Sequence, residues 1–92
     1  MIACYDAGCR IAGAVTFDTV GGLLRELQPR LAKGLETLDF SGVETADSAA
    51  LALVFSVMRQ TRQAGRTLNC TGLPSSFGTL AELYGVSDLL PA

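Results

Sequence analysis

The stretch Leu35-Glu-Thr-Leu-Asp-Phe-Ser-Gly-Val-Glu-Thr-Ala-Asp-Ser-Ala-Ala-Leu-Ala-Leu-Val-Phe-Ser-Val-Met58 decides the fold of this chain. It joins a strand pattern at residues 35–40, a Ser-Gly turn signal at 41–42 and the start of a long apolar helix pattern at 48–63. Asp47 and Ser48 stand where this helix begins, and side-chain oxygens there accept hydrogen bonds from the free N–H groups of the first turn. Two interpretations of the pair stay open: a helix cap, or a cap at an exposed corner that also meets a partner.

Composition limits the class of protein. A chain of 92 residues has room for one core, so we expect a single domain over residues 1–92. A net charge of −2 predicts no basic patch and argues against nucleic acid as a ligand. Hydrophobic residues make up 49% of the chain and charged residues only 17%. Either the core is unusually complete, or part of the surface is apolar and covered by another protein, which we favour.

The three cysteines, Cys4, Cys9 and Cys70, form no Cys-x-x-Cys pair, and the chain has no histidine, so no metal site is expected. We expect buried thiols in a reducing compartment. The N-terminal residues lack the pattern of a signal peptide, and no apolar run approaches the ~18 residues of a membrane span. The sequence therefore predicts a cytoplasmic protein that does not insert directly into a membrane.

Hydrophobic periodicity predicts an α/β fold with seven elements. Strands are expected at 2–6, 9–16, 35–40 and 67–71, and helices at 18–31, 48–63 and 75–84, in the order ββαβαβα. Strand–helix–strand units require right-handed crossovers, so we expect a small mixed four-stranded sheet with the three helices mainly on one face. In the helix at 48–63, Leu51, Val54, Phe55 and Met58 are the expected core face, and Phe77, Leu80, Ala81, Leu83 and Tyr84 are the expected packing residues of the last helix.

Catalytic groupings are missing from the sequence. Without histidine, a serine or cysteine cannot be activated as in Ser-His or Cys-His sites. The carboxylates are scattered, and Gly21-Gly22 is no phosphate loop because neither the Walker lysine nor the Gly-x-Gly-x-x-Gly spacing is present. We therefore predict a protein-binding module that is not an enzyme and needs no cofactor.

Four sequence segments carry a family resemblance. Leu38-Asp39-Phe40 followed by Thr45-Ala46-Asp47-Ser48-Ala49-Ala50-Leu51 resembles the signature of the STAS domain family. Thr79-Leu80-Ala81-Glu82-Leu83-Tyr84-Gly85 and Leu90-Pro91 are similar to the small STAS subunits of phospholipid-transporting ABC systems. The resemblance implies a non-catalytic subunit that binds and activates the ABC transporter ATPase subunit, lies at the inner membrane through this partner, and serves outer-membrane lipid asymmetry. The alternative is an anti-sigma factor antagonist that binds an anti-sigma kinase.

The resemblance also assigns roles to residues. The serine that is phosphorylated in anti-sigma factor antagonists corresponds to Ala49, so the usual acceptor is missing. The hydroxyl that contacts the ATPase in the transporter subunits corresponds to Ser48, which we also regard as a phosphorylation candidate. The predicted docking surface consists of Asp47, Ser48, Ala49, Ala52, Leu53 and Ser56. A nucleotide-binding regulator is disfavoured because no phosphate loop is present, and self-association into a homodimer stays open.

Overall fold

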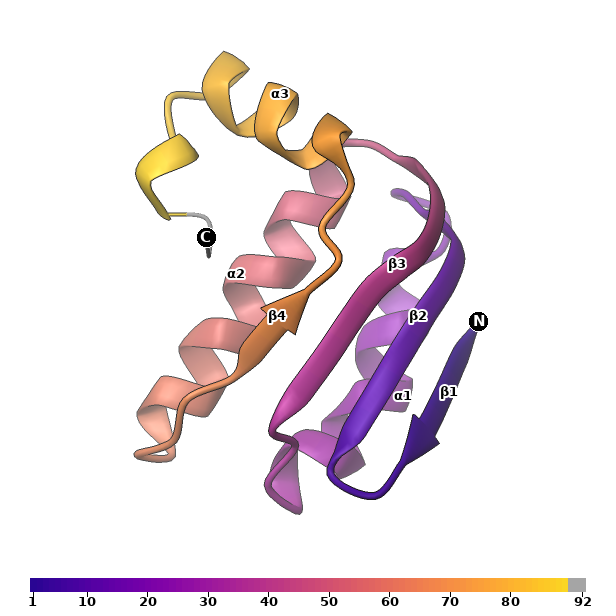
Figure 1. Cartoon of the computed structure of the whole chain (residues 1–92), viewed down its shortest axis with the longest axis vertical. Coiled ribbons are helices and arrows are strands. Elements are labelled where there is room, and N and C mark those ends of the chain that lie inside the picture. The colour runs from indigo at the N-terminus through magenta and orange to yellow at the C-terminus, as the bar shows by residue number, and fades with distance from the viewer. Residues whose placement is uncertain (90–92) are drawn as a thin grey trace.

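The computed structural model describes residues 1–89, so the Leu90-Pro91 motif lies outside the described residues. The elements follow the predicted order (Figure 1). They are β1 (Ile2–Tyr5), β2 (Gly8–Val15), α1 (Val20–Ala32), β3 (Thr37–Ala46), α2 (Ser48–Gln63), β4 (Asn69–Thr71) and α3 (Ser75–Leu83), followed by a 3-10 turn at Ser87–Leu89.

The four strands form one mixed sheet in the order β1-β2-β3-β4. β1 pairs antiparallel with β2, whereas β2, β3 and β4 run parallel. In Figure 1, α1 and α2 lie side by side behind the sheet and α3 lies at one end of it. This arrangement confirms the predicted α/β fold with helices mainly on one face.

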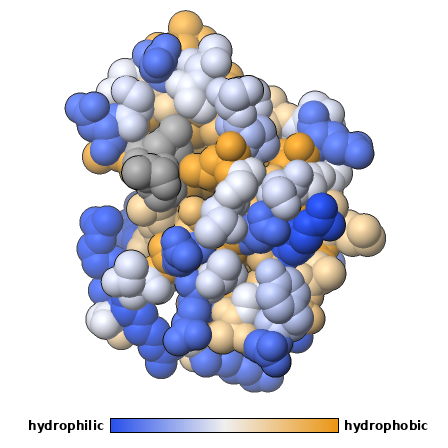
Figure 2. Space-filling model, viewed as in Figure 1, coloured by the Kyte–Doolittle hydropathy of each residue, from blue (hydrophilic) through white to orange (hydrophobic). Residues whose placement is uncertain are grey.

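The core lies between the sheet and the two long helices. Along β3, Leu38 and Phe40 are fully buried, while Asp39 and Ser41 point to the opposite face of the sheet. The Phe40 ring packs edge-on against Phe77 of α3, with ring centroids 5.7 Å apart. Figure 2 views the other face of the sheet, where polar side chains are interspersed with small apolar areas.

β3 is longer than predicted, and the turn predicted at Ser41-Gly42 is wrong. The strand continues to Ala46 because β2, which reaches Val15, offers a parallel partner along the whole length. Gly42 pairs with Ala12, and a Cβ atom built on Gly42 would lie 2.9 Å from the Ala12 Cβ. Close approach of two strands therefore explains this glycine, and ladder pairing outweighs the local turn signal.

The cysteine prediction is also wrong in part. Cys4 and Cys9 form a disulfide, and only Cys70 is a free, buried thiol within the described chain. The two residues are directly opposite in the β1–β2 hairpin, with Cα atoms 4.0 Å apart. Met1 and Ala12 exchange two backbone hydrogen bonds. Counting from that pair, Cys4 and Cys9 occupy a non-hydrogen-bonded position, where opposing side chains come closest.

Candidate functional site

Asp47 ties two segments together at the C-terminal ends of the parallel strands. Its Oδ1 accepts from the Ala49 N–H at 2.8 Å, which caps α2, and its Oδ2 accepts from the Phe17 N–H at 3.2 Å in the β2–α1 loop. Its own backbone N–H donates to the Val15 carbonyl at 3.3 Å. The structure therefore confirms the predicted cap and adds a second role, because the same carboxylate holds the β2–α1 loop beside the helix start.

Ser48 is the first residue of α2, and it differs from Asp47 in its hydrogen bonding. It is half-buried, and its hydroxyl makes no hydrogen bond to any of residues 1–89. It borders a shallow depression of about 240 Å³ that is otherwise lined by Leu51, Phe55, Tyr84 and Val86. A free hydroxyl at the rim of an apolar depression is equipped to bond to a group outside this chain.

The remaining predicted docking residues divide by burial. Ala49 is 4% exposed and Leu53 is fully buried, so neither side chain lies on the surface where the docking prediction placed it. Ala52 is exposed and Ser56 is half-buried, with its Oγ accepting from Gln60 at 3.2 Å. Ser48, Ala52 and Ser56 are four residues apart and thus share one stripe of α2. The partner contacts predicted for Asp47, Ser48, Ala52 and Ser56 stay predictions.

Two aromatic residues flank this position and were not predicted as site residues. Phe17 is 75% exposed beside Asp47, and Tyr84 is 57% exposed beside Ser48. Leu83 is likewise 75% exposed, so the expectation that Leu83 and Tyr84 pack in the core is wrong. Phe17 follows β2 as Asp47 follows β3, and the parallel topology brings both to the same edge. We call the surface formed by Phe17, Asp47, Ser48, Ala52 and Tyr84 the corner.

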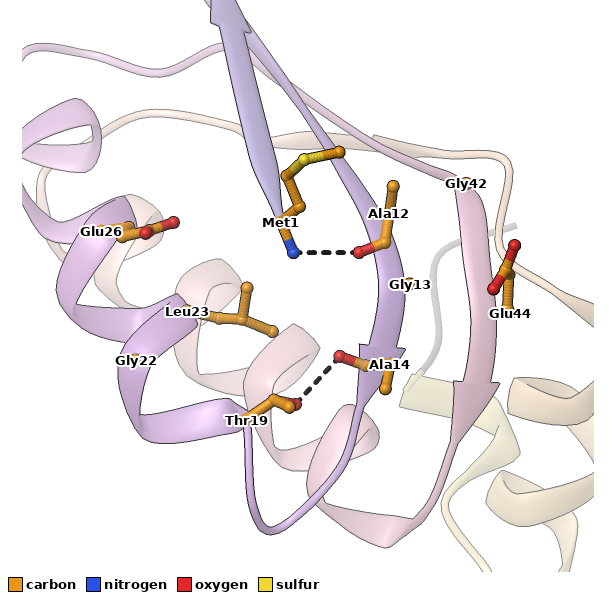
Figure 3. A pocket seen from close by; sticks show the side chains of 10 residues that line it. All are labelled: Met1, Ala12, Gly13, Ala14, Thr19, Gly22, Leu23, Glu26, Gly42 and Glu44. Atoms are coloured by element: carbon orange, nitrogen blue, oxygen red, sulfur yellow. Dashed lines mark hydrogen bonds between the residues drawn. The ribbon is translucent and has the colours of Figure 1, made fainter.

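A hollow larger than the depression beside Ser48 lies elsewhere, between the start of β1, β2 and α1 (Figure 3). It measures about 540 Å³, and small residues such as Ala12, Gly13 and Gly22 form much of its wall. The Met1 amine donates a hydrogen bond to the Ala12 carbonyl, and the Thr19 hydroxyl donates one to the Ala14 carbonyl. None of the predicted site residues reaches it, and its polar groups form no grouping suited to catalysis.

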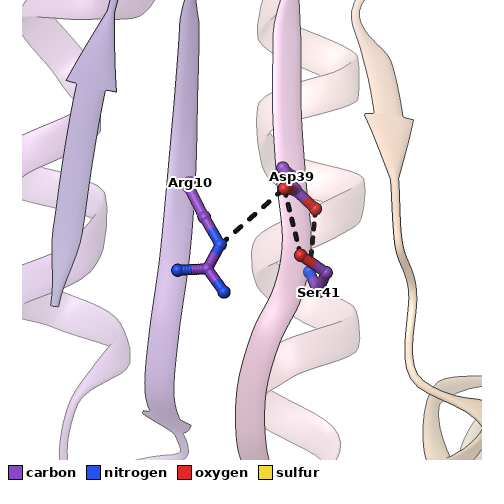
Figure 4. A network of polar contacts seen from close by, with 3 residues as sticks. All are labelled: Arg10, Asp39 and Ser41. Atoms are coloured by element: carbon purple, nitrogen blue, oxygen red, sulfur yellow. Dashed lines mark hydrogen bonds and ion pairs between the residues drawn. The ribbon is translucent and has the colours of Figure 1, made fainter.

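A second polar cluster lies on the open face of the sheet (Figure 4). Asp39 accepts from the Ser41 backbone N–H at 2.9 Å and from its hydroxyl at 3.0 Å, and Arg10 lies 3.8 Å away. The Ser41 backbone hydrogen bond is the main reason that the pKa of Asp39 is lowered from its usual 3.8. Asp39 and Ser41 thus satisfy each other within β3, and the exposed ion pair to Arg10 adds little to the stability of the sheet.

No group of three or more potential metal-binding side chains comes together within residues 1–89. In the same range, no helix combines the length and the apolar character required to cross a bilayer.

Comparison with known proteins assigns the family. The family model described as "Mlab, STAS domain" matches residues 6–91, and this chain belongs to the STAS domain family. More narrowly, the chain is 30% identical over 69 residues to the intermembrane phospholipid transport system binding protein MlaB of Escherichia coli K12. The aligned part is 74% of this chain and 71% of that protein, and MlaB of Shigella flexneri matches to the same extent.

A solved structure supports the same fold. The unphosphorylated form of the anti-sigma factor antagonist SpoIIAA superposes with a TM-score of 0.69, covering 96% of this chain and 82% of the other. At 15% sequence identity this likeness shows the fold alone. The family resemblance predicted from the Asp47–Leu51 segment and its neighbours is thereby confirmed.

Proposed function

We propose that this chain is the non-catalytic STAS subunit of an intermembrane phospholipid transport system, and that it binds and stabilises the system's ATPase subunit through the corner. The relatives in Escherichia coli and Shigella flexneri are named as binding proteins of such a system. On this proposal the chain works in the cytoplasm and reaches the inner membrane through its partner. Transport by the complex maintains the lipid asymmetry of the outer membrane.

The observation that carries the proposal is the contrast between two adjacent residues. Asp47 uses both carboxylate oxygens within the chain, whereas the Ser48 hydroxyl has no partner among residues 1–89. This hydroxyl borders an apolar depression that the exposed Tyr84 also lines, and the exposed Phe17 is held to the neighbouring Asp47 through its backbone N–H. Aromatic residues around a polar anchor are enriched in protein interfaces, and a small residue such as Ala52 lets a partner backbone approach closely.

Ser48→Arg tests the proposal by co-purification with the ATPase subunit. A long cation at the rim of the depression blocks close approach, so we expect the amount of bound ATPase to fall by roughly 30-fold, which corresponds to about 2 kcal/mol. Ser48→Thr keeps the hydroxyl and should retain binding. Each variant must show the thermal unfolding transition of the parent chain.

The matched control is Gln63→Arg, which adds the same side chain at an exposed position at the far end of α2. It should leave co-purification unchanged. If Ser48→Arg binds the ATPase as well as Gln63→Arg does, the corner is not the docking surface.

The anti-sigma alternative is tested with a further variant at Ser48. The position of the usual phosphorylated serine holds Ala49, which has no hydroxyl and lies buried. Phosphate transfer to Ser48 by an anti-sigma kinase, lost in Ser48→Ala, would favour that alternative over the transport function.

A further inference from the structure

The structure gathers positive charge at the end of the sheet opposite the corner. Five of the seven basic residues of the chain lie in or near the loops at that end. We call this surface the basic end; its residues are Arg30, Lys33, Arg59, Arg62 and Arg66. The expectation that a net charge of −2 leaves no basic patch is therefore wrong, because the charges are segregated.

Backbone hydrogen bonds hold the loops of the basic end together. The Ala7 carbonyl, in the β1–β2 turn, accepts from the Glu36 N–H at 2.8 Å. The Glu36 carbonyl in turn accepts from the Asn69 N–H at 2.9 Å. A Cβ atom built on Gly34 would lie 2.8 Å from a terminal nitrogen of Arg66, so this guanidinium rests against the α1–β3 loop. The loops at this end of the sheet are therefore joined to one another, and in Figure 1 they lie together at the end opposite α3.

These cations are not neutralised by their neighbours. All five are exposed, and within the described residues none takes part in an ion pair. The loops at this end are the β1–β2, α1–β3 and α2–β4 connections. Asp6 and Glu36 are their acidic residues, which leaves an excess of positive charge. Arg30 and Arg62 also complement the helix dipoles in the last turns of α1 and α2, but Lys33 and Arg66 lie beyond the helices.

The shape of this surface indicates what it binds. Its hollows are small, about 160 Å³ beside Arg30 and Lys33 and about 110 Å³ beside Arg62 and Arg66. The leucines beneath them, Leu35 and Leu68, are 4% and 7% exposed. A protein interface has an apolar centre, whereas the described loops at this end expose no large apolar side chain. A layer of lipid phosphates requires only exposed cations, and guanidinium groups bind phosphate with two hydrogen bonds.

We propose that the basic end contacts the anionic phospholipid headgroups of a bilayer surface while the corner stays free for a protein partner. The two surfaces lie at opposite ends of the sheet, so both are accessible at once. The contact is peripheral and electrostatic, with no insertion of the chain. The proposal goes beyond the proposed function, since it needs no ATPase and holds for the isolated chain.

Co-sedimentation of the full chain with vesicles tests this proposal. Vesicles of phosphatidylcholine alone are compared with vesicles in which about a third of the lipid is phosphatidylglycerol. We expect binding to the anionic vesicles at about 0.05 M salt and its loss at about 0.5 M, where the Debye length falls to roughly 4 Å and the attraction between exposed charges is largely screened. Equal partitioning to both vesicle types would overturn the proposal.

Paired double variants localise the effect. Lys33→Gln with Arg62→Gln removes two charges from the basic end and should weaken binding about 30-fold, at roughly 1 kcal/mol per cation. Arg10→Gln with Arg25→Gln removes the same charge from other exposed positions and should retain binding. Equal loss in the two double variants means a non-specific charge effect, and displacement by inorganic phosphate at constant ionic strength means a site for single phosphates; either result contradicts the proposal.

Discussion

The two ends of the sheet are held together in different ways. At the corner, one side chain joins the β2–α1 loop to α2, since Asp47 accepts from both Phe17 and Ala49. At the basic end, the turn and loops are joined by backbone hydrogen bonds through Ala7, Glu36 and Asn69. A surface held by backbone bonds tolerates changes of its side chains, whereas a surface held by one carboxylate does not. We therefore expect loss of the Asp47 carboxylate to alter structure as well as binding, whereas mutations of the basic side chains should alter binding alone.

The largest effect is expected when the carboxylate at the corner is removed. Asp47→Ala deletes the helix cap and leaves the Phe17 N–H without its acceptor, so we expect a loss of about 2 to 3 kcal/mol in the free energy of unfolding. For a chain of this size that corresponds to a fall in Tm of roughly 10 to 20 °C. Urea and thermal unfolding measure both quantities.

Glu36→Ala is the control at the basic end. It removes an exposed carboxylate but keeps both backbone hydrogen bonds of this residue, so stability should stay within about 0.5 kcal/mol of the parent. Equal losses in the free energy of unfolding for Asp47→Ala and Glu36→Ala would show that side chains hold both ends of the sheet. The proposed difference between the two ends would then be wrong.

A smaller effect is expected from the covalent link near the basic end. The Cys4–Cys9 disulfide closes a short loop, and the chain-entropy model gives about 2 kcal/mol for a loop of this size. Reduction with dithiothreitol should therefore lower Tm, and Cys4→Ser with Cys9→Ser should match the reduced parent and no longer respond to the reagent.

Thiol titration checks the same bond independently. Under denaturing conditions the unreduced chain should show the Cys70 thiol alone, and the reduced chain all three cysteines. In the native protein Cys70 should react slowly, because burial raises its pKa to about 11 and keeps the thiol protonated. Three reactive thiols in the unreduced, denatured chain would rule out the disulfide.

Much of the fold follows from local pattern. The alternation of Leu38 and Phe40 with polar residues marks β3, and Gly65 with the preceding basic residues marks the end of α2. The cap at Asp47 depends only on residues within the same turn, and it is found where predicted. Features determined by neighbours in sequence are thus accessible to sequence analysis.

Features determined by residues distant in sequence are harder to predict from local sequence patterns. The extension of β3 through Gly42 depends on the length of β2. The Cys4–Cys9 bond is an exception, because the two cysteines are separated by 5 positions and the exact register of the hairpin decides whether they face each other. In α2 the apolar residues extend around most of the helix, so periodicity does not tell which side meets the sheet. Leu53 and Val57 are fully buried, whereas Phe55 and Met58 of the predicted core face are half-buried.

The same difference between local and long-range features applies to the two candidate surfaces. Ser48 is found from the sequence because it adjoins the cap, but Phe17 and Tyr84 reach the corner only through the parallel topology. A net charge of −2 does not reveal the basic end, because its cations come from the last turns of two helices and the loops after them, which meet only in the folded chain.

The smallest effect is expected at Asp39, on the open face of the sheet. Its dependence on pH shows whether a hydrogen bond or an ion pair stabilises this carboxylate. The pKa of Asp39 is lowered chiefly by the Ser41 backbone N–H, with Arg10 a lesser cause. A carboxyl with a lowered pKa in the folded state contributes stability above its unfolded pKa of about 3.9 and loses it as the pH falls through the folded value. Urea unfolding between neutral pH and about pH 2 should therefore show a loss below about pH 4 that is smaller in Asp39→Asn.

Two further variants decide the cause of this effect. Arg10→Gln should keep most of the acid-dependent loss, because the pair is exposed, its Nε and Oδ2 are 3.8 Å apart, and such pairs contribute little. Asp6→Asn is the matched control for the removal of one exposed carboxylate, because asparagine also adopts the positive φ of 46° at the β1–β2 turn. If Arg10→Gln abolishes the loss as fully as Asp39→Asn does, Asp39 is stabilised by the ion pair. The open face would then depend on side-chain charge, as the corner does, and not on the backbone bonding that holds the basic end.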